Sequence, residues 1–166
     1  AADGFADGDL TGDQLRREIT ATDVSDYTLG LAPRIGADRI INVASQMQEL
    51  APLKANKGGF DVMIEASGNE QAILTGLDVL KPRGILVQLG LGGSMGLPQN
   101  LVVSKEVEIR GSFRFHEEFA LAVELINRRR VDLTPLLTKV LPLDQAEKAF
   151  QLASDRSRAM KVQIAF

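Results

Sequence analysis

The sequence predicts an α/β fold with a parallel sheet. Short apolar runs alternate along the chain with stretches of helical period, and this alternation is typical of βαβ units. Two of the runs, FDVMIEA (60–66) and GILVQLG (84–90), are apolar through their centres, as strands buried on both faces are. Parallel sheets bind ligands at the carboxyl ends of their strands. The loops that follow the predicted strands come after Asp23, Ala66, Leu89 and Phe113.

The elements follow one another from about residue 18. Strands are expected at 18–23, 39–42, 60–66, 84–90, 107–113 and 161–166. Helices are expected at 26–36, which Gly36 closes, after the capping residue Asn69, at 117–129, and after Asp144 and Glu147, which have capping-box spacing. The helix at 117–129 carries one apolar face, which consists of Phe119, Ala120, Val123 and Ile126. The last helix is expected to turn an apolar face inward, which consists of Ala146, Ala149, Phe150 and Ala153.

Composition excludes several classes of function. Of the 166 residues, 45% are apolar and 25% are charged, which is the balance of an ordinary globular protein. The net charge of −3 predicts neither a nucleic acid nor a membrane as partner, and no apolar run approaches the ~20 residues that span a bilayer. Nothing suggests an export signal, so we expect a cytoplasmic protein. With no cysteine and one histidine, the chain offers neither thiolate ligands nor a two-histidine zinc site.

Asp23 is the most informative single residue, because it ends a predicted strand and precedes a helix. In dinucleotide-binding folds a carboxylate at this place accepts hydrogen bonds from the ribose 2′-hydroxyl and repels a 2′-phosphate. The alternative is that Asp23 or Ser25 only caps the following helix.

The glycine-rich turn that normally precedes such a carboxylate is missing. Residues 1–18 contain no strand pattern and no correctly spaced glycines. This segment instead places Asp7, Asp9, Thr11, Gly12 and Glu18 on positions of an EF-hand calcium loop. No entering helix precedes it, so a loosely packed terminus competes with a calcium-binding module as its interpretation.

Further candidates lie after the other strands. Ala66–Ser67–Gly68 and LGLGG (89–93) follow buried strands, and their glycines would let a ligand approach the backbone, although either could be an ordinary turn. Arg114 follows the last strand of the sheet and could contact a phosphate, a carboxamide or a hydroxyl. For His116 we favour a helix-start residue without chemistry, since no partner acid or nucleophile is evident.

Five segments together resemble one known family. They are GADRIINVAS, FDVMIEASGNEQA, GLDVLKPRGILVQLGLGG, SKEVEIRGSFRFHEEF and SDRSRAMKVQIAF. In this order and at this spacing they are similar to the zinc-dependent medium-chain dehydrogenases, within them to the polyol branch of sorbitol-type and L-idonate-type enzymes. The resemblance covers about residues 18–166.

The resemblance implies a Rossmann-type NAD-binding domain over 18–114, whose first strand and glycine-rich turn are absent or replaced. Residues 115–166 would return to the catalytic domain, and 1–17 would be an atypical N-terminal segment. Asp23 matches the ribose-binding acid and indicates NAD over NADP. Other matched cofactor positions are Ala66, Ser67 and Gly68 beside the riboses, Leu89, Gly90 and Phe113 around the carboxamide, Arg114 near cofactor and substrate, and Lys161 on the pyrophosphate.

The departures from the family pattern bear on activity. Family members carry their zinc ligands and proton relay in an N-terminal half that does not match here, so zinc is expected in the intact enzyme only. Pro33 and Gly30 lie inside the helix predicted at 26–36, where a proline costs ~3 kcal/mol and a glycine ~1 kcal/mol. NAD binding by the chain itself is therefore expected to be weak or lost.

Two functions remain open beside the calcium-binding module. The first is the cofactor-binding part of an oxidoreductase that acts on the secondary alcohol of a polyol or sugar acid. The second is an inactive Rossmann-like binding or dimerisation module. For either we expect a homodimer through Gly93–Asn100, with Met95–Gly96–Leu97 as the pairing strand, because an apolar strand edge is satisfied by a symmetric partner. A flexible loop on a monomer is the alternative.

Overall fold

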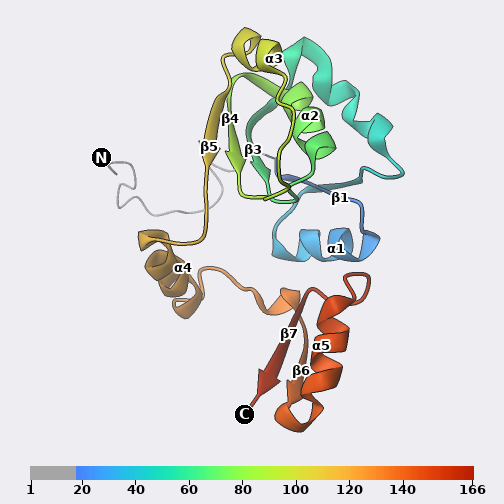
Figure 1. Ribbon diagram of the computed structural model, residues 1–166, viewed down its shortest axis with the longest axis vertical. Coiled ribbons are helices and arrows are strands. Elements are labelled where there is room, and N and C mark those ends of the chain that lie inside the picture. The colour runs from blue at the N-terminus through green and yellow to red at the C-terminus, as the bar shows by residue number, and fades with distance from the viewer. Residues whose placement is uncertain (1–17) are drawn as a thin grey trace. The chain divides into compact units, whose positions relative to one another are not determined.

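The computed structural model describes residues 18–166 as an α/β protein in which every strand pair is parallel (Figure 1). This confirms the predicted fold class. The strands are β1 (Thr20–Asp23), β2 (Arg39–Asn42), β3 (Phe60–Glu65), β4 (Leu80–Gln88), β5 (Glu108–Gly111), β6 (Leu137–Pro142) and β7 (Lys161–Ala165). The α-helices are α1 (Asp26–Leu31), α2 (Glu70–Val79), α3 (Gln99–Ser104), α4 (Glu117–Asn127) and α5 (Ala146–Ser154).

The strands form three sheets, with the orders β1-β2, β3-β4-β5 and β6-β7. A doubly wound sheet has the order 3-2-1-4-5-6. Leaving out its first strand keeps the pairs 3-2 and 4-5-6, and these are the neighbours that β1 to β5 have here. No strand precedes β1 within residues 18–166. The pairing among the described residues therefore agrees with the corresponding neighbours of a Rossmann-type sheet.

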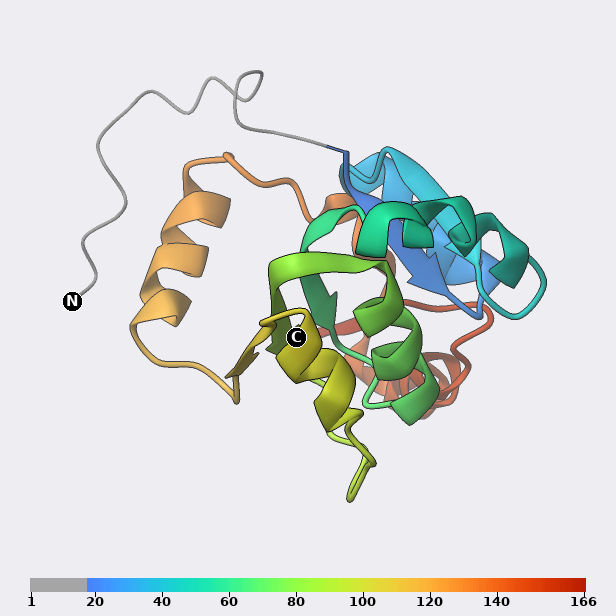
Figure 2. The ribbon, with the colours of Figure 1, turned by 90° about the horizontal axis from the view of Figure 1, so that it is seen from above.

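The chain divides into two compact units, each of which we describe by itself. Val43–Leu133 forms one of them around the sheet β3-β4-β5. Helix α2 packs on β3 and β4 (Figure 2). Gly76 allows the close contact, because a Cβ there would overlap the side chain of Met63. The core of this unit consists of Ile73, Leu77, Leu80 and Leu86.

The other unit joins residues 18–42 to Thr134–Phe166. Its buried residues include Leu29, Ile41, Ala149 and Ala159. Helix α5 packs against β6 and β7. The hydroxyl groups of Tyr27 in α1 and Thr138 in β6 are 3.0 Å apart, so a hydrogen bond links two segments that are 111 residues apart in the sequence.

Several expected details are wrong. The α-helix predicted over 26–36 ends at Leu31 and continues as a 3-10 turn over Ala32–Ile35, because Pro33 lacks the N–H that an α-helix needs. Gly36 does close it, in a left-handed conformation. Strand β3 is not buried on both faces, since Val62 and Ile64 are 49% and 68% exposed.

The apolar face of α4 is uncovered, and the inward face expected on α5 is buried only in part. No residue of α4 is buried, and the helix stands apart from the β3-β4-β5 sheet in both views (Figures 1 and 2). In α5 Ala149 is buried, but Phe150 is 69% exposed. The capping box predicted at Asp144 is wrong as well. The N-cap of α5 is Gln145, and its side chain makes no hydrogen bond to the first turn of the helix.

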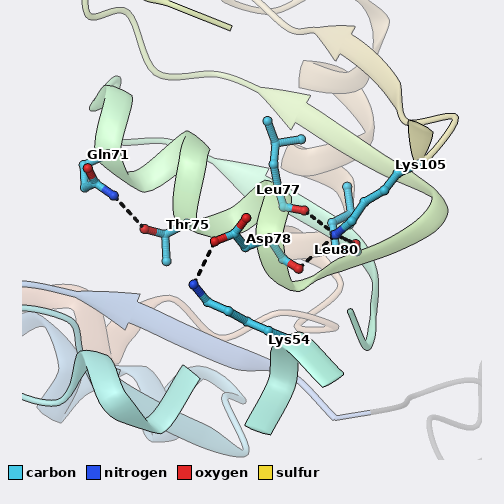
Figure 3. A network of polar contacts seen from close by, with 7 residues as sticks. All are labelled: Lys54, Gln71, Thr75, Leu77, Asp78, Leu80 and Lys105. Atoms are coloured by element: carbon cyan, nitrogen blue, oxygen red, sulfur yellow. Dashed lines mark hydrogen bonds and ion pairs between the residues drawn. The ribbon is translucent and has the colours of Figure 1, made fainter. Parts of the chain in front are cut away.

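A buried lysine fixes the turn between α2 and β4 (Figure 3). The Lys105 ammonium group donates to the carbonyl oxygens of Leu77, Asp78 and Leu80, at 2.8, 2.9 and 2.8 Å. These are carbonyls at the end of a helix, which have no partner inside it. Burial lowers the pKa of Lys105, and the nearby charge of Asp78 acts in the opposite direction. No pattern in the sequence singles out this lysine.

Candidate functional site: the loops at the carboxyl edge of the sheet

Three loops gather at one edge of the β3-β4-β5 sheet. They contain the candidate residues Ala66, Ser67, Gly68, Leu89, Gly90, Phe113 and Arg114. The strands are parallel and in register, with Glu65 opposite Gln88 and Gln88 opposite Gly111, so their carboxyl ends lie side by side. The third loop is tied to β4 by the Ser112 N–H, which donates to the Gln88 carbonyl at 3.0 Å. The structure therefore brings seven of the nine predicted site residues to one edge.

Glu65, the last residue of β3, holds the first of these loops and was not predicted. The residue is only 2% exposed. Its carboxylate accepts hydrogen bonds from the Ser67 N–H at 2.7 Å, the Ser67 hydroxyl, the Gly68 N–H at 3.0 Å and the Gln88 side-chain amide at 2.5 Å. A buried ionisable group is tolerated when its hydrogen bonds are satisfied in this way.

These contacts also decide the charge of Glu65. Burial by itself raises its pKa, but the hydrogen bonds from the Ser67 hydroxyl, the Gly68 and Ser67 N–H groups and Gln88 together outweigh burial. The pKa of Glu65 is therefore lowered below its ordinary value of 4.5, and the group is an anion at neutral pH.

The first two loops contact each other backbone to backbone. Gly68 has a φ of 68°, in the left-handed region that favours glycine. A Cβ on Gly90 would overlap the backbone nitrogen of Gly68, and a Cβ on Gly92 would overlap its carbonyl oxygen. These glycines were predicted to admit a ligand. The contacts show that Gly90 and Gly92 are required for the packing of one loop on the other.

The third loop presents Phe113 and Arg114 at the surface. Phe113 is 59% exposed, and the Arg114 guanidinium carbon lies 4.9 Å from the centre of its ring, within the range of a cation–π contact. Arg114 has a φ of 60°, an uncommon value for an arginine. Leu89, which directly follows β4, is 42% exposed. His116 stands at the N-cap of α4 and makes no side-chain cap bond.

Asp23 and Lys161 belong to the other compact unit. Asp23 ends β1 as expected, and one oxygen of its half-buried carboxylate accepts a hydrogen bond from the Ser25 N–H at 2.9 Å. The cap of α1 is Ser25, whose hydroxyl accepts from the Thr28 N–H at 3.3 Å. Asp23 thus shapes the turn, while Ser25 caps the helix. Lys161 is the exposed first residue of β7.

Metal ligands are not gathered in the described part of the chain. Residues 18–166 contain no group of three or more histidine, aspartate or glutamate side chains that could hold a metal ion. These residues do not fit a zinc site. The EF-hand pattern that starts at Asp7 lies, apart from Glu18, outside the described residues.

Two polar residues were missed because polar groups that lie inside the fold resemble surface groups in a sequence. Glu65 and Gln88 both end strands, immediately before the loops that they hold. Glu65 could have been found from one signal in the sequence. It is a carboxylate at the end of an apolar run, two residues before a serine and three before a glycine. Gln88 carries no comparable signal.

Parallel strands with loops gathered at their carboxyl edge define a Rossmann-type α/β protein. The chain belongs to the zinc-binding dehydrogenases, a family that matches residues 15–128. This confirms the predicted family. None of the described helices has the length and apolar character needed to cross a membrane.

The relatives include polyol and sugar-acid dehydrogenases. The chain is 39% identical over 150 residues to the L-idonate 5-dehydrogenase (NAD(P)(+)) of Escherichia coli K12, covering 90% of this chain and 43% of the relative. It is 32% identical over 151 residues to the sorbitol dehydrogenase of Bos taurus, covering 89% and 42%. The crystal structure of L-idonate 5-dehydrogenase from Escherichia coli superposes with a TM-score of 0.83 at 39% identity, over 90% of this chain and 43% of that one. The chain therefore spans less than half the length of these relatives.

Proposed function

We propose that this chain is the cofactor-binding part of an NAD-dependent oxidoreductase that acts on the secondary alcohol of a polyol or sugar acid. The observation that carries the proposal is the set of three ordered loops at one edge of a parallel sheet, in a chain 39% identical to an L-idonate 5-dehydrogenase. Edges of this kind are where open α/β sheets bind their ligands.

Each loop has a role under this proposal. Ala66, Ser67 and Gly68 would lie beside the riboses, and Leu89, Gly90 and Phe113 would supply backbone groups to the carboxamide. Arg114 would lie near the cofactor and the substrate. Asp23 would bind the adenosine ribose, and Lys161 would bind the pyrophosphate. A bound nicotinamide would accept or donate the hydride.

A second function is favoured by a separate observation. The described residues hold no group of three or more histidine, aspartate or glutamate side chains that could hold a metal ion. A chain of this kind could act as an inactive binding or dimerisation module. Under both proposals we expect the isolated chain to oxidise neither L-idonate nor sorbitol with NAD. We also propose a homodimer through Gly93–Asn100, for which the exposed Leu97 gives apolar surface.

Titration with NADH, followed by its fluorescence, tests the first function against the second. Saturable binding by protein of confirmed mass supports a cofactor-binding part. Fluorescence that stays linear to millimolar NADH contradicts it and favours the inactive module. A parallel titration with calcium tests the EF-hand pattern of the N-terminal segment.

A further inference from the structure

Glu65 is joined to both loops, and through two different groups. Its carboxylate accepts from Ser67 and Gly68 in the loop after β3, as described above. Its backbone carbonyl accepts from the N–H groups of Leu89 and Gly90 in the loop after β4, at 2.8 and 3.0 Å. One residue therefore receives hydrogen bonds from four loop residues that the proposed function assigns to the cofactor.

Gln88 closes the arrangement from the neighbouring strand. Its side-chain amide donates to the Glu65 carboxylate at 2.5 Å and to the Gly90 carbonyl at 2.8 Å. Both protons of the Gln88 amide are thus used, one on Glu65 at the end of β3 and one on Gly90 in the loop after β4. Because Gly90 contacts Gly68 directly, a change at the Glu65–Gln88 pair is transmitted to both loops at once.

The number of donors explains why this position needs a carboxylate. An ionised glutamate has two oxygens with about four acceptor sites and no donor. Four donors converge on Glu65, namely two N–H groups, one hydroxyl and one amide. A glutamine of the same shape would present an NH₂ group to one or more of these donors and leave them without an acceptor.

We propose that Glu65 is a positioning residue, which sets the shape of the loops 66–68 and 89–92 for the dinucleotide without touching it. This rests on the proposed function. Glu65 is 2% exposed, and its carboxylate is surrounded by its hydrogen-bond donors. It therefore acts through the backbone groups that it orders. Charge-assisted hydrogen bonds are suited to this, since they are roughly twice as strong as neutral ones.

The central test compares Glu65→Gln with a reciprocal exchange, Glu65→Gln combined with Gln88→Glu. The single variant places two amide NH₂ groups against each other. The double variant restores a hydrogen bond between residues 65 and 88 with donor and acceptor reversed, but it loses the hydrogen bond to the Gly90 carbonyl, so only a partial rescue is expected. We expect Glu65→Gln to weaken NADH binding about tenfold, the factor that one charge-assisted hydrogen bond supplies. The double variant should recover part of this loss, which a general loss of packing would not predict.

A control separates positioning from stability. Lys105→Met removes a buried charge in the same unit, at the end of the sheet where β4 begins, and leaves both loops intact. It should lower the melting temperature and bind NADH as the unchanged chain does. If Glu65→Gln does not fold, Gln88→Met replaces it, because that variant removes both Gln88 hydrogen bonds and keeps the carboxylate.

The backbone amide signals of Ser67, Gly68, Leu89 and Gly90 in an NMR spectrum give a readout that does not need NADH. We expect all four to shift in Glu65→Gln and in Gln88→Met, and to stay in place in Lys105→Met. Unmoved signals, or unchanged NADH affinity in either loop variant, would overturn the positioning role. If the unchanged chain binds no NADH, the proposed function fails, and with it the cofactor role of Glu65. Amide signals that still shift in Glu65→Gln and Gln88→Met would then show only that Glu65 and Gln88 hold the two loops in place.

Discussion

The ammonium nitrogen of Lys105 lies 2.8 Å from the carbonyl oxygen of Leu80, the first residue of β4. It donates in the same way to the last turn of α2, so removing it leaves three carbonyl oxygens without this donor. We expect Lys105→Met to lower the free energy of unfolding by about 1–3 kcal/mol, the cost of leaving a buried polar group unsatisfied. Urea denaturation monitored by circular dichroism measures it.

Lys54→Met is the matched control for this prediction. Lys54 forms an ion pair with Asp78 at 2.7 Å, but both side chains are 45% exposed. Exposed pairs contribute about 0–1 kcal/mol. Equal losses from the two variants would show that Lys105 acts only as a surface charge does.

The two glycines of the segment after β1 should respond in opposite directions. Gly30 lies inside α1, and a Cβ added there would meet nothing within 4 Å, so Gly30→Ala should stabilise the chain by about 0.5–1 kcal/mol. Gly36 is equally open, but its φ of 110° disfavours any side chain. Gly36→Ala should therefore destabilise by about 1–2 kcal/mol. Thermal unfolding of both variants checks the signs, and a gain at position 36 would contradict the left-handed cap.

The acid response of the chain should depend on Glu65. Its pKa is lower in the fold than the ordinary 4.5, so the stability it contributes is present above that value and is lost as pH falls through the folded pKa. The difference in unfolding free energy between the unchanged chain and Glu65→Gln should be largest near pH 7 and shrink as the pH falls below 4.5. Glu108→Gln is the control, because the pKa of Glu108 is also lowered, by Arg110, but at the exposed surface. A constant difference across this range would contradict an ionised Glu65.

Cofactor preference tests Asp23. If the chain binds a dinucleotide, the Asp23 carboxylate should favour NAD over NADP, since it repels a 2′-phosphate. Asp23→Ser should narrow the ratio of the NAD and NADP affinities by about tenfold or more, since a charge pair at about 4 Å is worth about 1 kcal/mol in bulk water and about 4 kcal/mol near a protein surface. Asp26→Ser removes an equal charge from the first turn of α1 and should leave the ratio unchanged. An unaltered ratio in Asp23→Ser would mean that Asp23 only forms its hydrogen bond to Ser25.

Assembly tests the segment Gly93–Asn100. In the single chain Met95 packs against the core of its unit, the Gly96 N–H donates to Glu70 at 3.0 Å, and Leu97 is 43% exposed. We expect a symmetric dimer by light scattering at tens of micromolar, and its loss in Leu97→Asp, because a buried unpaired charge at an interface is costly. Val103→Asp, at a residue 75% exposed, should leave the dimer intact. A monomer in the unchanged chain would rule the interface out.

The sequence predicts strands well where their centres are apolar and poorly elsewhere. RIIN (39–42) and FDVMIEA (60–66) match β2 and β3 within one residue, because period and propensity agree there. Strand β6 was missed: LTKVLP mixes lysine and proline with apolar residues, and its pairing with β7 comes from sequence more than 15 residues away. Helix α3 was missed because its six residues are too short for a helical period to show.

Burial was harder to predict than secondary structure. The apolar side of α4, with Phe119 and Ile126, has the spacing of an inward face. Both residues are nevertheless exposed, and no other residue of this helix is buried. Spacing tells which residues share a face and not whether another element covers it. Conversely, Glu65 and Lys105 are charged residues that are buried, and only the convergence of their hydrogen-bond partners in space reveals why.

The close backbone contact between Gly68 and Gly90 shows that a glycine-rich run after a strand is not by itself a sign of nucleotide binding. Gly90 and Gly92 are required where one loop lies on the other, whether or not a nucleotide ever binds. A paralogue that had lost its cofactor would still be under selection to keep them, while Asp23 or Phe113 would be free to drift. When such sequences are sorted into binders and non-binders, a retained LGLGG segment should carry little weight. The acid at the end of β1 should carry more.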